Sequence, residues 1–277
     1  MLCVIGTIFF ILPIWTVWGN KALMVSTISI SSSHIPAAFS GFRIAQVSDL
    51  HNSEFGKNNT ELLKLLSESR PDIIAITGDL IDANHTDVGI ALGFAQESVR
   101  IAPTYYVTGN HEAASPQYDT LKAGLEEAGV IVLEDEAVSL ERNGETITLL
   151  GLGDPDFTVK GGMFGETSAM VSTKLKNLDD GEGGYTILLS HRPELFETYV
   201  NCGIDLVFAG HAHGGQFRLP FISGLVAPNQ GLFPQYDAGL YTDGSTSMVV
   251  SRGIGNSIIP FRFNNRPEIV LVELNAR

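Results

Sequence analysis

The chain has 277 residues, enough for one large domain or two small ones, and 44% of them are hydrophobic. Together with 29 glycines, this composition is typical of a globular α/β protein with many turns. The formal net charge of −14 argues against non-specific nucleic-acid binding, because that function needs basic surface to contact phosphates. The two cysteines, Cys3 and Cys202, do not indicate a structural disulfide, since Cys3 lies in an apolar N-terminal run.

The N-terminal run, residues 2–19, contains no charged side chain and is nearly long enough to span a bilayer as a helix. Trp15 and Trp18 lie near its end, where interfacial anchors are common. A cleaved signal peptide is one alternative, but a charged n-region and a small-residue cleavage site are both missing. A buried core helix is the other, but the run lies at a terminus and a serine-rich segment follows it. We therefore predict a single-pass cell-membrane anchor over residues 1–21, on a side of the membrane that Lys21 alone does not decide.

After the anchor we predict a serine-rich linker over residues 22–41, with His34 solvated, and then one catalytic domain over residues 42–277. The first half of this domain alternates strands and helices. Strands are predicted at residues 42–47, 72–77 and 103–107, and helices at residues 57–69, 87–100 and 116–128. This alternation predicts a largely parallel sheet, whose ligand site lies beyond the carboxyl ends of the strands.

The second half is less regular. Short strands are predicted in residues 130–152, followed by a surface insertion over 154–184 with one helix near 166–178. A strand (185–189), a helix (193–201) and a strand (204–208) come next, and final strands are predicted at 246–252 and 267–274. Residues 219–241 are predicted as a loop rich in Pro, Gly, Phe and Tyr, whose apolar side chains either contact acyl chains or pack onto the sheet.

Polar side chains with metal-binding chemistry follow five of the predicted strands. They are Asp49 and His51, Asp79, Asn110 and His111, His191, and His211 and His213. Carboxylates, imidazoles and an amide without a thiolate suit a divalent metal of borderline hardness. There are more candidate ligands than one tetrahedral ion needs, so two ions that share a bridging carboxylate would use them all.

The motifs DLH, GDLID, GNHE, SH and GHAH, in this order, resemble those of the calcineurin-like metallophosphoesterase superfamily. Further stretches, such as GGQFRLP and GLFPQYDAGLY, resemble its membrane-associated bacterial branch of YkuE-type and YaeI-type phosphodiesterases. The resemblance covers about residues 42–275. It implies a four-layer αββα sandwich with a dinuclear site, here preceded by the N-terminal transmembrane helix.

The resemblance also implies a role for each motif residue. Asp49, His51 and His213 would hold one divalent ion, Asn110, His191 and His211 the other, and Asp79 would bridge them; manganese, iron and zinc are the candidates. His111 would donate the proton to the leaving group, and Asp82 would orient it, although Asp82 could instead cap a helix. For Glu112 we favour a helix N-terminal charge. Ala83 stands where phosphoprotein phosphatases of this superfamily usually have an arginine, which argues against their mode of phosphate binding.

The resulting expectation is a hydrolase that cleaves phosphodiester or pyrophosphate bonds with a metal-activated hydroxide. Lipid-linked substrates, such as UDP-diacylglucosamine or phospholipids, fit an enzyme held at the membrane. The alternatives are a phosphomonoesterase or nucleotide phosphodiesterase with soluble substrates, and a non-catalytic scaffold. Arg218, Arg252 and Arg262 would either bind a second phosphate or pair with surface carboxylates.

Overall fold

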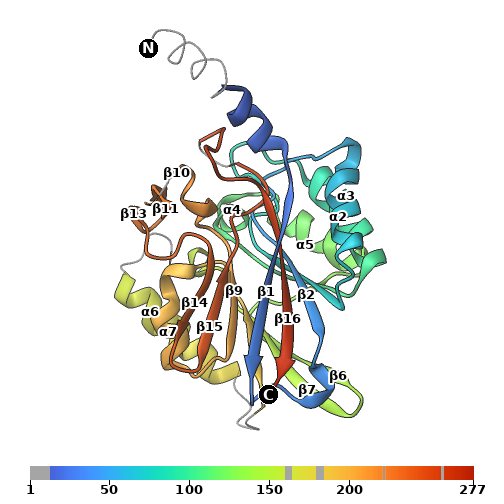
Figure 1. The fold of residues 1–277 in the computed structure, drawn as a ribbon, viewed down its shortest axis with the longest axis vertical. Coiled ribbons are helices and arrows are strands. Elements are labelled where there is room, and N and C mark those ends of the chain that lie inside the picture. Colours follow the sequence, from blue (N-terminus) through green and yellow to red (C-terminus); the bar gives the residue numbers. More distant parts are fainter. Residues whose placement is uncertain (1–12, 160–163, 179–183, 220, 222, 257–258) are drawn as a thin grey trace.

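The computed structural model describes residues 13–159, 164–178, 184–219, 221, 223–256 and 259–277 (Figure 1). In these residues two sheets of six strands face each other. The first sheet runs, in spatial order, β1 (Met24–Ser32), β16 (Glu268–Ala276), β2 (Phe42–Val47), β3 (Ile73–Thr77), β4 (Thr104–Val107) and β5 (Ile131–Val132). The second runs β14 (Gly239–Asp243), β15 (Thr246–Val250), β9 (Leu206–Ala209), β8 (Thr186–Leu189), β7 (Glu145–Gly151) and β6 (Glu136–Arg142).

Helices cover the outer face of each sheet. The first sheet is covered by α2 (Thr60–Glu68), α3 (Val88–Ile101) and α5 (Tyr118–Glu127), and the second by α6 (Phe164–Leu178) and α7 (Phe196–Asn201), as Figure 1 shows on its two sides. Successive strand residues point to opposite faces: Ile44 packs between the sheets, whereas Ala45 packs against the helices. The central strands are therefore buried on both faces, and the four layers are α, β, β and α.

The strand pairing brings the predicted site residues to one edge. Strands β2, β3 and β4 are mutually parallel, and so are β7, β8, β9 and β15. The predicted alternation of parallel strands and helices is thus confirmed. The predicted antiparallel stretch is also confirmed, because β6 and β7 form a hairpin in which Asn143 and Gly144 take positive φ angles of 51° and 82°.

The predicted linker was largely wrong, because residues 24–32 form strand β1 of the first sheet. This strand pairs in parallel with β16 along its whole length, from Met24 opposite Glu268 to Ser32 opposite Ala276. Its serines alternate with Ile28 and Ile30, which pack into the core between the sheets. His34 is exposed as predicted, and its Nδ1 lies 3.1 Å from Oδ1 of Asp205.

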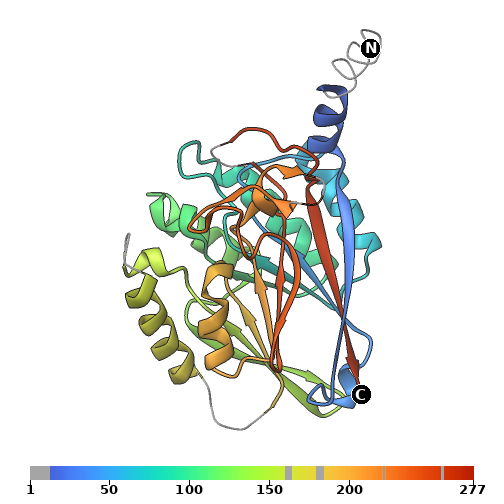
Figure 2. The same ribbon diagram turned by 60° about the vertical axis from the view of Figure 1, so that its left-hand side comes forward.

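Residues 13–21 of the predicted anchor are helical, and residues 1–12 lie outside the described residues. No helix in the described part of the chain is both long and apolar enough to cross a bilayer. Figure 2 shows this short helix at one end of the domain, with the C-terminus at the opposite end. Asn20 fixes the helix to the domain, because its side chain both donates to the carbonyl of Arg262 and accepts from the Arg262 N–H.

Two irregular regions are more ordered than predicted. The helix in residues 154–184 is not a surface insertion, since Val171 and Leu175 of α6 are buried against the second sheet. The predicted loop over residues 219–241 contains short strand pairs. These are β10 (Arg218–Leu219) with β11 (Ser223–Gly224), and β12 (Val226–Ala227) with β13 (Gly231–Leu232).

Candidate metal centre

The predicted ligands follow strand ends, and their backbones turn sharply there. Asp49, Asp79 and His211 have φ angles of 54°, 53° and 65°, in the left-handed region that non-glycine residues rarely adopt. Adjacent loops hold these turns in place, because the Asp49 N–H donates to the carbonyl of Gly78 and the His51 N–H to that of Asp79. Such strained backbone persists only where its surroundings fix it, and it is concentrated at functional sites.

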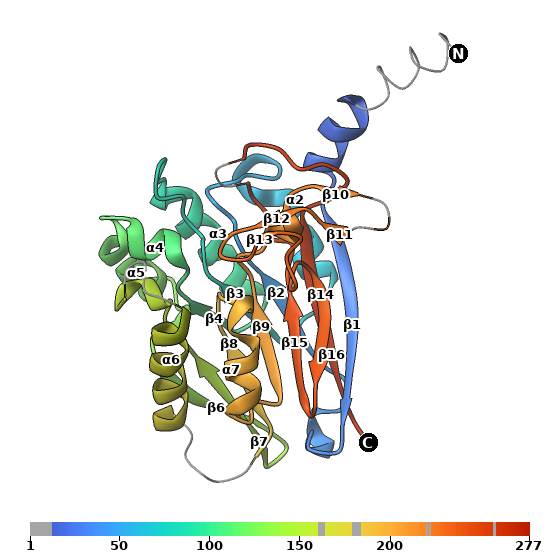
Figure 3. The same ribbon diagram turned by 90° about the vertical axis from the view of Figure 1, so that its left-hand side faces the viewer.

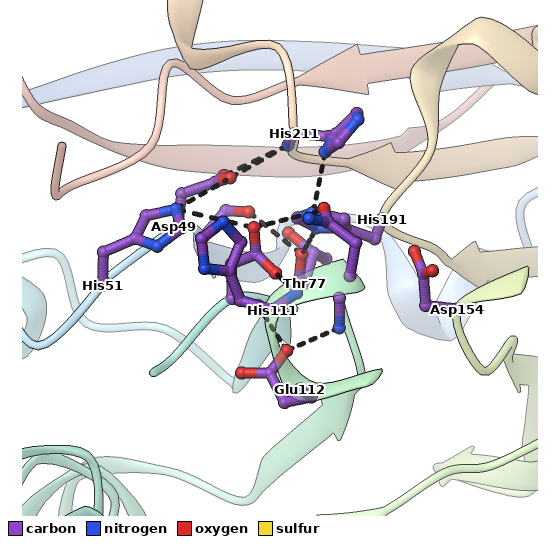
Figure 4. A network of polar contacts seen from close by, with 12 residues as sticks. Asp49, His51, Thr77, His111, Glu112, Asp154, His191 and His211 are labelled. Carbon is purple, nitrogen blue, oxygen red and sulfur yellow. Dashed lines mark hydrogen bonds and ion pairs between the residues drawn. The ribbon is translucent and has the colours of Figure 1, made fainter. Parts of the chain in front are cut away.

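Asp79 lies between His51 and His191, two of the residues labelled in Figure 4. Its Oδ2 is 3.5 Å from Nε2 of His51 on one side and 3.2 Å from Nε2 of His191 on the other. Its Oδ1 accepts a hydrogen bond from the backbone N–H of His111. One carboxylate therefore faces both histidines, which is the position required of a bridging ligand.

The first group of ligand atoms belongs to Asp49, His51, Asp79 and His213, all buried and within 4.8 Å of one another. Nε2 of His213 lies 3.5 Å from Oδ1 of Asp49 and 3.3 Å from Nε2 of His51. The second group belongs to Asp79, His191 and His211. Asn110, the first residue of α4 (Asn110–Ala114), joins this group with its Oδ1 3.2 Å from Nε2 of His191.

The donor chemistry of the second group suits a cation. Nδ1 of His191 is 2.8 Å from the carbonyl oxygen of Thr77 and must carry the proton of the neutral ring, which leaves a lone pair on Nε2. This lone pair faces two further acceptors, Oδ2 of Asp79 and Oδ1 of Asn110, each 3.2 Å away. Converging buried acceptors repel one another unless a positive charge lies between them. The described residues thus fit a dinuclear metal site, with Asp79 shared.

The electrostatics of the histidines agree with this interpretation. Burial lowers the pKa of His51, His211 and His213 below the usual value, so these rings are neutral and can offer a lone pair to a metal. Burial also acts to lower the pKa of His191, but the charge of Asp79 outweighs it and raises that pKa to about 10.

His111, the predicted proton donor, lies beside this cluster with its ring centroid 4.5 Å from that of His51. The backbone N–H of Ala83 donates to its Nδ1 at 3.0 Å, so a neutral ring carries its proton on Nε2. Asp82, predicted to orient His111, has its Oδ2 3.7 Å from that Nδ1. Its Oδ1 accepts from the N–H groups of Asn84 and His85. Asp82 therefore shapes the turn that follows Ala83. It does not cap a helix, because the N-cap of the next helix, α3, is Asp87.

Glu112 does more than the helix N-terminal charge that we favoured. Its carboxylate is fully buried and accepts from the backbone N–H groups of Asp79, Ile81 and Gly109. It thereby joins the loop that carries Asp79 to the helix that carries Asn110 and His111. Burial and the charge of Asp79 raise the pKa of Glu112 to about 7. A sequence pattern cannot distinguish this clamp from an ordinary N-terminal acid.

A buried ion pair beside His211 was not predicted at all. Arg192 donates from Nε and Nη2 to the two oxygens of Asp154, at 2.6 and 2.8 Å, and its Nη1 is 3.3 Å from Nε2 of His211. Nδ2 of Asn229 is also 3.3 Å from that ring nitrogen. The only feature of the sequence that pointed to this ion pair was the arginine directly after His191. Asp154 lies in an irregular segment with no periodicity to draw attention to it.

Three other arginines had two possible roles, and the structure favours the structural one. Arg218 pairs with Asp237 at 2.9 Å, and Arg252 lies 3.7 Å from Glu268. Arg262 is buried and donates to backbone carbonyls of the loop around it. The apolar side chains of residues 219–241 divide between the predicted alternatives, because Tyr236 and Tyr241 pack against the second sheet whereas Phe221, Leu232 and Phe233 are exposed.

Comparison with known proteins gives consistent results. The family model described as calcineurin-like phosphoesterase matches residues 42–215. The Bacillus subtilis protein named uncharacterized metallophosphoesterase YkuE is 30% identical over 258 residues, which cover 90% of this chain and 84% of that protein. The Escherichia coli protein named phosphodiesterase YaeI is 28% identical, over 84% of this chain and 82% of that protein.

Among solved structures, a Danio rerio protein described as a dimetal phosphatase has a similar fold. Its TM-score is 0.50 with 12% sequence identity, and the match covers 84% of this chain and 99% of that one. This likeness concerns the arrangement of the elements.

Proposed function

Because this chain belongs to the calcineurin-like phosphoesterase family and is a metal-dependent phosphoric ester hydrolase, we propose that it cleaves phosphodiester or pyrophosphate bonds at the membrane. The proposed substrates are lipid-linked, such as UDP-diacylglucosamine or phospholipids. The proposed location is the cell membrane, through an anchor over residues 1–21.

The observation that supports the chemistry most is the convergence of buried acceptors on Asp79. In our proposal Asp49, His51 and His213 hold one divalent ion, and Asn110, His191 and His211 hold the other, both drawn from manganese, iron and zinc. When bound, such a pair supplies Lewis acidity to a phosphoryl group and lowers the pKa of the attacking water. Asp79 faces both groups and is the proposed bridging ligand.

The proposed proton donor is His111. Because Ala83 donates to Nδ1, the neutral ring has its proton on Nε2, and a protonated ring retains one there. Proton donation to a leaving oxygen is worth about 10²–10⁴-fold in rate. Its benefit is greatest for an alkoxide leaving group, which is a poor one, and this supports alkyl phosphodiesters as substrates over activated monoesters.

Two observations support the membrane part of the proposal. Residues 2–19 carry no charged side chain, and the described end of that run is a helix bonded to the domain through Asn20. The domain edge that this helix contacts is also the edge at which β2 ends. Met24 of β1, just after the helix, pairs with Glu268 of β16. Two residues further along β16, Val270 pairs with Gln46 of β2, three residues before Asp49.

The test uses the full-length protein supplied in turn with manganese, iron or zinc. Turnover of bis-p-nitrophenyl phosphate should exceed that of p-nitrophenyl phosphate, and UDP-diacylglucosamine or a phospholipid presented in vesicles should be hydrolysed. Faster monoester turnover would make the chain a phosphomonoesterase. Hydrolysis of soluble diesters alone would reject the lipid substrate, and bound metal without any turnover would indicate a scaffold.

A further inference from the structure

Large apolar side chains are exposed mainly on one face of the domain. Of the twelve that are exposed among the described residues, nine lie in residues 13–23, 214–236 and 252–267. They include Trp15 and Trp18 of the short helix, Phe221, Leu232 and Phe233 of the region after His213, and Phe261. A soluble protein rarely gathers so many exposed apolar residues without a binding partner. We call the described residues of these three segments the apolar face.

Side-chain and backbone contacts hold the three segments of the apolar face together. Asn20 bonds with the backbone of Arg262, which joins the helix to the third segment. Gln216 donates to the carbonyl of Phe261, and the rings of Phe217 and Phe261 are 5.4 Å apart, which joins the second segment to the third. Figure 3 shows strands β10 to β13 at the same end of the molecule as the short helix.

The apolar face is also distinct in charge. The chain has 31 acidic residues, yet none lies in the three segments. Lys21 and Arg266 add positive charge to them, whereas Arg218 and Arg252 face Asp237 and Glu268, and Arg262 is buried. The guanidinium of Arg266 lies 5.1 Å from the centre of the Trp18 ring, and Lys21 is exposed. A surface that combines aromatic side chains with basic residues and excludes acids complements a bilayer whose headgroups are anionic.

Two exposed phenylalanines of this face have strained backbones. Phe221 and Phe233 have φ angles of 72° and 56°, and their side chains are fully exposed and 63% exposed. A bulky residue in the left-handed region costs about 1–3 kcal/mol, and the strain is retained mainly where function needs it. Here it projects aromatic rings away from the domain.

We propose that the apolar face docks on the surface of a lipid bilayer, so that the phosphoesterase domain lies against the membrane in a fixed orientation. Residues 2–12 support this occupant over a protein partner, because in the sequence they form an uncharged apolar run directly before the short helix of this face. The region after His213 belongs to the face, so the metal centre would open close to the headgroups. The inference extends the proposed anchoring of residues 1–21 to the domain itself.

The experiment places an environment-sensitive fluorophore on single cysteines in full-length protein whose Cys3 and Cys202 are replaced by serine. The three labelled variants are Phe221→Cys on the face, Val17→Cys in the anchor, and Phe157→Cys as a matched control. Phe157 is an exposed phenylalanine outside the face. The protein is reconstituted in phosphatidylcholine–phosphatidylglycerol vesicles that contain a phosphatidylcholine with a quenching nitroxide near its headgroup.

We expect the lipid-borne nitroxide to cause a loss of fluorescence at positions 17 and 221 but not at position 157. Quenching at 17 without quenching at 221 would overturn the docking proposal and leave the anchor in place. No quenching at any position would reject both, and equal quenching at all three would show that the domain has no fixed orientation. Because the readout does not depend on turnover, it is independent of whether the proposed hydrolysis is correct. A second copy covering the face would shield position 221 from the nitroxide and also count against the proposal.

Discussion

Replacement of Asp154 by alanine should destabilise the protein strongly, although no predicted metal ligand is removed. The side chain of Asp154 is completely buried, and that of Arg192 is 6% exposed. Loss of this carboxylate leaves a buried guanidinium without its two charge-assisted hydrogen bonds. Removing one partner of such a buried pair costs about 3–5 kcal/mol. For a domain of this size the melting temperature should fall by roughly 6–20 °C.

The matched control is Asp156→Ala. Asp156 contacts the same guanidinium, with Oδ2 3.0 Å from Nη2 of Arg192, but its side chain is 36% exposed. An ion pair of this kind contributes about 0–1 kcal/mol. Unfolding of both variants by guanidinium chloride, monitored by circular dichroism, measures the difference between their free energies of unfolding. If the two variants lose the same free energy of unfolding, burial is not what makes the Arg192–Asp154 pair important.

Three further predictions concern the metal centre. His111→Ala should slow hydrolysis of alkyl phosphodiesters by about 10²–10⁴-fold with unchanged metal content, whereas the exposed neighbour His85→Ala should be close to wild type in the same steady-state assay. Asp79→Asn should lose both metals and activity together, so that mass spectrometry finding two bound ions would disprove the bridging role. Gly109→Ala should abolish metal binding, because its Cβ would overlap the Asp79 carboxylate, while Gly93→Ala, with open space at that position, should bind metal normally and be slightly more stable in thermal unfolding.

The metal centre was predictable because its residues follow a regular rule of the fold. Asp49 and Asp79 each come directly after a buried run, and parallel strands bring such positions to one edge of a sheet. Asp154, by contrast, reaches Arg192 from an irregular segment 38 residues away. No periodicity marks that position, so a contact of this kind can be found only in three dimensions.

Strand β1 shows a different reason for failure. The alternation of Ile28 and Ile30 with serines has the period of a half-buried strand. The serine content of the segment is instead typical of a linker, so composition and periodicity point to different structures. Because its partner β16 lies at the other end of the chain, nothing nearby in the sequence corrected that interpretation.

The pairing of β1 with β16 has a consequence for synthesis on the ribosome. The first strand of the domain cannot find its partner until residues 268–276 have emerged, after every other strand of the two sheets has been translated. Closing so long a loop is slow, since its entropy must be lost before the contacts form. Until β16 pairs with β2, β2 is an unprotected edge strand. A nascent chain that stalls before β16 has emerged should therefore be prone to aggregation.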